Sequence, residues 1–111
     1  MKGKIVLIPF PFTNLTATKL RPALVLFEGE RDVVVVFISS KVPHKLGPTD
    51  IIVDETHPDF KLTGLKVASV IRLDKVATVS KELILGEIGE IGVKLKKEIN
   101  RTISEAYRFS F

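Results

Sequence analysis

The sequence predicts a mainly β protein that ends in one helix. Short runs rich in Val, Ile, Leu and Phe recur along most of the chain, turn-type residues bound each run, and helical spacing of apolar residues occurs only near the C-terminus. Closely spaced strands with a single terminal helix favour a small, strongly curved antiparallel barrel over a parallel α/β sheet.

The first three predicted strands cover residues 4–9, 23–27 and 33–39, where β-branched and other large apolar residues dominate. The segment "FEGERD" between the second and third strands predicts a hairpin connection around Gly29. Further strands are predicted at residues 50–54, 66–73 and 75–79, the last of which alternates apolar and polar residues. We therefore expect at least five short strands.

Proline and glycine interrupt the segments "KVPHKLGPT" and "ETHPDFKLTGL", which we interpret as loops. Ser80 is predicted to cap a short helical turn at "SKEL", because its hydroxyl can accept from backbone N–H groups further on. The glycine-rich segment "LILGEIGEI" remains open between helix and strand.

The chain from Val93 onward predicts an amphipathic helix that docks on the sheet. Its apolar residues recur at helical spacing: Leu95, Ile99, Ile103 and Ala106. Lysine, arginine and glutamate interleave on the other face at spacings that allow pairing, which indicates a solvated face.

Composition favours one domain over residues 1–111, because 45% of the 111 residues are hydrophobic, 27% are charged, and no linker-like segment divides them. No apolar run approaches the roughly 20 residues that span a bilayer, and "MKGKIVLIPFPF" is too short for a secretory signal, so we expect a cytoplasmic protein without membrane contact. The absence of cysteine excludes disulfides, thiolate catalysis and cysteine zinc sites. A net charge of +4 modestly favours a polyanionic partner.

Neither nucleotide-binding nor metal-binding motifs are present. His44 and His57 lie in proline-containing loops, where an acid/base role is conceivable but a solvated histidine is more common. Asp54, Glu55 and Asp59 gather near His57 without the spacing of a hard-cation site, so a solvated charged loop is the better interpretation.

Arg21 and Ser39 form the most informative pair. Arg21 opens the second strand, after the stretch "PFPFTNLTATKL", and Ser39 ends the third, so a tightly curved sheet can bring both to one rim. A guanidinium offers a planar fork of donors that suits phosphate, and a serine hydroxyl can act beside it. From these residues alone, a surface or ion-pair role for Arg21 stays open.

Three segments carry a resemblance to a known family: "GKIVLIPFPFTNLTATKLRPALVL", "VVVVFISS" and "ASVIRLDKVATVSKELILGEIGEI". In this order they resemble the MazF/PemK family of toxin–antitoxin ribonucleases. The resemblance covers residues 3–91, and "RPALVL" and "RLDK" are its most specific parts.

The resemblance implies an SH3-like barrel with a C-terminal helix, usually a homodimer, that cleaves single-stranded RNA within a short sequence and is silenced by an antitoxin. The implied cleavage reaction needs no cofactor and no metal ligands, because RNA supplies its own 2′-hydroxyl as nucleophile. The family's catalytic arginine falls on Arg21 and its catalytic hydroxyl on Ser39. The residues expected to contact RNA are Lys4, Thr18, Lys19, Arg21, Ser40, Lys41 and His44.

The sequence departs from the family pattern at three places. Lys4 stands where an acidic residue is common, Ser39 replaces threonine but keeps the hydroxyl, and the first loop has no acidic residue. Two other functions stay open: a relative of the same fold that poisons DNA gyrase, as CcdB-type toxins do, and a barrel that binds RNA without cleaving it.

Overall fold

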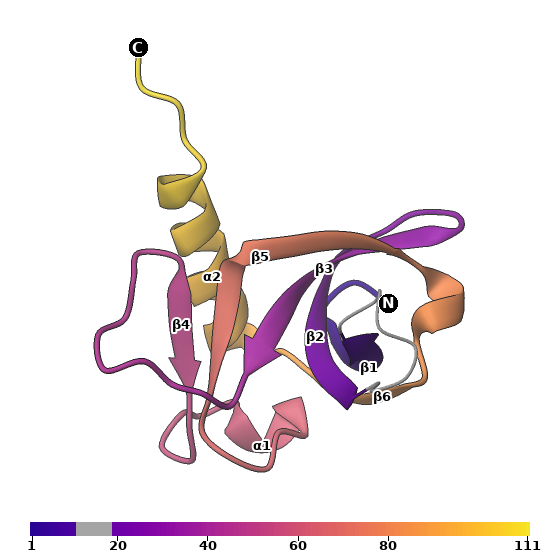
Figure 1. The fold of residues 1–111 in the computed structure, drawn as a ribbon. Coiled ribbons are helices and arrows are strands. Elements are labelled where there is room, and N and C mark those ends of the chain that lie inside the picture. The colour runs from indigo at the N-terminus through magenta and orange to yellow at the C-terminus, as the bar shows by residue number, and fades with distance from the viewer. Residues whose placement is uncertain (11–18) are drawn as a thin grey trace.

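The structure, a computed structural model, describes residues 1–10 and 19–111, apart from the side chain of Phe10. Six strands form one antiparallel sheet in the order β4-β5-β3-β2-β1-β6, which curls into a half-barrel (Figure 1). The strands are β1 (Lys4–Phe10), β2 (Lys19–Glu28), β3 (Asp32–Ser39), β4 (Asp50–Val53), β5 (Ser69–Ser80) and β6 (Gly86–Glu90). The helices are α1 (Phe60–Thr63), the 3-10 turn η1 (Lys81–Leu83) and α2 (Val93–Ala106). The predicted fold class is confirmed.

The curled sheet has a hydrophobic core on each face, which explains why its central strands are apolar without interruption. In β3, Val36 and Ile38 belong to one core, whereas Val33 and Val35 belong to the other. Side chains alternate between the faces of a strand, so a continuous apolar run can fill both cores at once.

Helix α2 covers the first of these cores. Leu95 and Ile99 are buried there together with Ile51 of β4, and Ile103 is partly buried against them. The last apolar residue of the predicted face, Ala106, is exposed, since the helix extends past the sheet at its C-terminal end (Figure 1). No helix in the described part of the chain combines the length and the apolarity needed to cross a membrane.

The two strands predicted at residues 66–73 and 75–79 are one continuous strand, β5. Its pairing with β3 jumps abruptly: Val36 pairs with Val76, but the next residue, Phe37, pairs with Arg72. The residues of β5 between these two partners, 73–75, therefore form a bulge. This bulge bends β5 where the sequence predicts one strand to end at residue 73 and the next to begin at residue 75.

The structure also decides the predicted cap at Ser80 and the segment "LILGEIGEI". Ser80 caps η1 as predicted, since its Oγ accepts the N–H of Glu82 at 3.2 Å. The segment that was open between helix and strand contains β6, which pairs with β1.

The prediction that "ETHPDFKLTGL" is entirely loop is wrong, because it contains α1. Gly64 ends this short helix in the left-handed conformation, with a φ of 74°, and its N–H donates to the carbonyl of Lys61. Near Gly64 the α1 segment packs closely against β6. A Cβ on Gly64 would lie 1.9 Å from the carbonyl oxygen of Ile88, and one on Gly89 would lie 2.3 Å from the carbonyl of Thr63.

We predict that Gly89→Ala lowers the free energy of unfolding by about 1–3 kcal/mol, because its methyl group would overlap backbone atoms of Thr63 that cannot rotate away. Urea unfolding followed by circular dichroism measures the change. Gly86→Ala is the matched control in the same strand, because no atom lies within 4 Å of its added Cβ. Equal stability of the two variants would contradict the close contact between α1 and β6.

Candidate functional site

A pocket of about 470 Å³ opens where the ends of β2 and β3 meet the β5 bulge. Ser39 and four apolar residues form part of its lining. Its cationic residues come from β2, β5 and the segment after β3: Arg21, Lys41, Arg72 and Lys75. Such a concentration of positive charge beside an apolar surface suits a ligand that combines anionic groups with flat, apolar ones.

Strand register explains why Arg21 and Ser39 meet in this pocket. Ala23 of β2 pairs with Phe37 of β3, and two residues further along each antiparallel strand lie Arg21 and Ser39. A step of two residues keeps a side chain on the same face of a strand, so Arg21 and Ser39 are directed to the same side. The Oγ of Ser39 also accepts the N–H of Lys41 at 3.1 Å, which connects the serine to the next cation.

Arg72 is the residue directly before the bulge, and its side chain lines the pocket. An aspartate contacts its guanidinium there. Its Nε lies 3.0 Å from Oδ1 of Asp50 and 3.8 Å from Oδ1 of Asp74. The other carboxylate oxygen of Asp50 accepts the N–H of Gly47 at 2.8 Å. Asp50 therefore links Arg72 to the loop before β4 and restricts the orientation of the guanidinium.

Contacts on two sides hold the bulge itself. Leu73 is buried in the first core, and its N–H donates to the carbonyl of Thr49 at 2.9 Å. Its own carbonyl accepts the hydroxyl of Tyr107, at the C-terminal end of α2. Lys75, two residues after Leu73, lines the pocket with a side chain that is 59% exposed.

Sequence reasoning missed Arg72 and Lys75 as site residues. The signal was present, because "RLDK" places two cations on either side of the junction between the two strands predicted there. Only the bulge directs both of these side chains to the pocket that contains Arg21.

Among the residues expected to contact RNA, those that follow Ser39 differ in whether they line the pocket. Lys41 lines the pocket with Arg21, whereas Ser40 and His44 are exposed and are not among its lining residues. Thus only Ser39 of the two neighbouring serines lines the pocket.

The remaining expected contacts lie near β1 and the start of β2. Lys19 is exposed two residues before Arg21. Lys4 lies at the opposite end of β1 from Ile8, the partner of Arg21, and its Nζ is 3.7 Å from Oε2 of Glu90. The structure therefore does not bring Lys4 to the pocket. Thr18 lies outside the described residues.

The expectation that His57 is a solvated loop histidine is wrong, because its side chain is only 10% exposed. The backbone N–H of Asp59 donates to its Nδ1 at 3.0 Å, and its Nε2 lies 3.1 Å from Oε1 of Glu98 in α2. Since Nδ1 is an acceptor, the geometry assigns the ring proton to Nε2, which donates to Glu98. The histidine thus joins the loop to α2.

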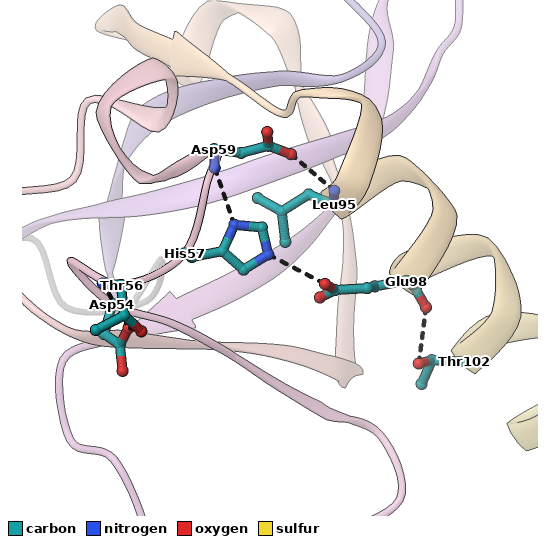
Figure 2. A network of polar contacts seen from close by, with 7 residues as sticks. All are labelled: Asp54, Thr56, His57, Asp59, Leu95, Glu98 and Thr102. Carbon is teal, nitrogen blue, oxygen red and sulfur yellow. Dashed lines mark hydrogen bonds and ion pairs between the residues drawn. The ribbon is translucent and has the colours of Figure 1, made fainter.

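The acidic cluster near His57 is also more structured than expected. Oδ2 of Asp59 accepts the N–H of Leu95 at 2.8 Å and so caps α2, whose own N-cap residue, Gly92, has no side chain (Figure 2). Thr56 donates to Asp54 through its hydroxyl and its N–H, and these hydrogen bonds lower the pKa of that carboxyl. Over residues 1–10 and 19–111, no group of three or more His, Cys, Asp or Glu residues is placed to hold a metal ion.

The fold and the pocket define a class: small proteins with a curled antiparallel sheet, a C-terminal helix and a cationic pocket at the strand ends. A family model described as PemK-like, MazF-like toxin of type II toxin–antitoxin system matches residues 1–107, and the chain belongs to this family. Comparison with curated protein sequences yields no match.

Solved structures show the same fold at low sequence identity. A mycobacterial endoribonuclease in complex with its cognate antitoxin is 16% identical, with a TM-score of 0.72 over 100% of this chain and 97% of that chain. The Mycobacterium tuberculosis toxin MazF-mt6 is 20% identical, with a TM-score of 0.73 over 97% of this chain and 99% of that chain. The predicted family and the barrel-like fold are thereby confirmed.

Proposed function

We propose that this MazF-like toxin is an endoribonuclease that cleaves single-stranded RNA within a short sequence and without a metal ion. The observation that carries the proposal is the pocket in which Arg21, Ser39 and three further cations meet. Membership of the toxin family and the fold shared with the mycobacterial endoribonuclease and with the toxin MazF-mt6 support it.

In the proposed reaction the RNA provides the nucleophile. The 2′-hydroxyl gives its proton to solvent water, and its oxygen attacks the adjacent phosphorus. The bond from phosphorus to the 5′-oxygen breaks, the 5′-oxygen takes a proton from water, and the products are a 2′,3′-cyclic phosphate and a 5′-hydroxyl. Negative charge grows on the non-bridging oxygens in the transition state, where the guanidinium fork of Arg21 can bind it. Because arginine stays protonated, charge stabilisation is its role, rather than direct proton donation. The hydroxyl of Ser39 supplies a further hydrogen bond beside the reacting phosphate.

The other cations of the pocket suit the RNA phosphates on either side of the phosphate that reacts. Arg72 is oriented by Asp50, whereas Lys41 and Lys75 extend toward solvent, so the pocket combines one fixed fork with two adaptable charges. Binding that depends on several phosphate contacts weakens steeply with salt. Phe37, which is partly buried in the pocket lining, provides apolar surface for a base.

A cognate antitoxin that blocks this pocket in the cytoplasm is the expected protein partner. We include a homodimer in the proposal, because Val76 of the pocket lining and Leu20, one residue before Arg21, are large apolar side chains that are 49% and 50% exposed. A twofold contact that covers these side chains would join two pockets into one longer RNA groove.

We predict that purified protein cleaves mixed single-stranded RNA in the presence of EDTA, and that Arg21→Ala slows cleavage roughly a hundredfold to a thousandfold, or about 3–4 kcal/mol. Arg31→Ala is the matched control, because Arg31 is exposed and remote from the pocket lining. Sequencing the 5′ ends of the products defines the cleavage sequence.

The same assay separates the other functions. RNA that is bound but stays intact would indicate a non-catalytic RNA-binding protein, and inhibition of DNA gyrase without any effect on RNA would indicate a gyrase poison. Near-normal cleavage by a well-folded Arg21→Ala variant would remove Arg21 from the mechanism.

The two adjacent serines make a second prediction. Ser39→Ala is expected to slow cleavage more than about tenfold, or 1.4 kcal/mol, whereas Ser40→Ala stays near the wild-type rate because Ser40 does not line the pocket. Ser39→Thr keeps the hydroxyl and retains activity. The opposite ranking in single-turnover cleavage would assign the catalytic hydroxyl to Ser40.

The dimer is expected to persist in sedimentation at concentrations on the order of tens of micromolar, well above a dissociation constant of about one micromolar. Leu20→Glu is expected to shift the protein to monomer, because it introduces a charge at the proposed contact. Glu30→Lys on the exposed β2–β3 turn is the control. A wild-type protein that sediments as a monomer would contradict this part of the proposal.

A further inference from the structure

A second groove, of about 710 Å³, lies between β4 and α2. It shares no residue with the lining of the Arg21 pocket. One side presents the edge strand β4, and the other presents charged residues of α2. Apart from Asp50, which orients Arg72, the RNA cleavage proposed above uses none of these residues, so the groove needs its own explanation.

Strand β4 offers an open hydrogen-bonding edge in this groove. The N–H of Leu73 donates to the carbonyl of Thr49, and antiparallel pairs alternate, so Ile51 and Val53 direct their backbone groups to β5. Ile52 therefore directs its N–H and its carbonyl away from β5. Within the described ranges of the chain, nothing pairs with these two groups.

The facing side of the groove is positively charged. Lys94, Lys97 and Arg101 follow a spacing of three and four residues, which places them on one face of α2. None of them forms an ion pair with another described residue. The two carboxylates in the lining are already engaged, Glu98 with His57 and Asp50 with Arg72.

We infer that this groove binds an acidic peptide segment in an extended conformation, which adds to β4 as a further strand. An added strand can both accept from and donate to Ile52, while its acidic side chains can reach the cations of α2. Charge complementarity thus selects the peptide, and the open edge fixes its backbone. A sugar-phosphate chain matches the cations but has no N–H groups at strand spacing for the carbonyl of Ile52, so a peptide fits both sides better than RNA.

The test uses the whole 15N-labelled protein and a capped peptide of alternating Glu and Val, about eight residues long. We expect the peptide to slow hydrogen exchange of the Ile52 amide at least about tenfold and to shift the amide resonances of Lys94, Lys97 and Arg101. Unchanged exchange at Ile52, or shifts confined to the Arg21 pocket, would overturn the inference. Equal binding of a Lys-Val peptide, or stronger binding of oligouridylate in this groove, would overturn it as well.

Two variants separate the contribution of the β4 edge to peptide binding from that of the α2 cations. Ile52→Pro removes an N–H that pairs with nothing in the described chain, and we expect it to weaken peptide binding roughly tenfold. The double variant Lys97→Glu with Arg101→Glu should weaken binding at least as much, whereas Lys96→Glu, exposed on another side of α2, should not. The charge variants keep the test decisive if Ile52→Pro does not fold. Undiminished binding by the double variant would contradict the charge complementarity.

Discussion

The jump in register between β3 and β5 is the constraint on which the pocket depends. Three residues of β5 lie between the partners of two consecutive β3 residues, and they cannot continue the ladder with β3. The buried side chain of Leu73 stabilises the bulge, since returning this side chain to water would cost about 2 kcal/mol. With Leu73 inside the core, Arg72 and Lys75 on either side are directed to the pocket.

Clustering cations at one place is unfavourable unless anions or solvent offset the repulsion. Here Asp50 partly neutralises Arg72, while Lys75 remains largely exposed to water, which screens it. The pocket therefore stays positive without a buried, unpaired charge. Its residual positive potential is available to an anionic ligand, and a ligand that displaces water there gains more from each contact than it would on an open surface.

The opposite end of the fold is organised by close backbone contacts and by side chains that replace missing caps. Gly64 and Gly89 let α1 lie directly against β6, and Gly92 leaves room for the carboxylate of Asp59, from which an added Cβ would be only 2.5 Å away. Asp59 then caps α2, and His57 bonds to the same helix one turn further on. This assembly keeps α2 beside β4 and thereby shapes the second groove.

The sequence by itself determined most of the strands and the terminal helix, and it located Arg21 and Ser39 at strand ends, because each depends on local apolar periodicity, turn residues or a short motif. It did not determine α1, the low exposure of the His57 side chain, or the membership of Arg72 and Lys75 in the pocket. These depend on contacts between segments far apart in the chain, such as Asp59 with α2 and Phe37 with Arg72. A bulge or a borrowed helix cap has no local periodicity, so only tertiary packing decided where these side chains lie.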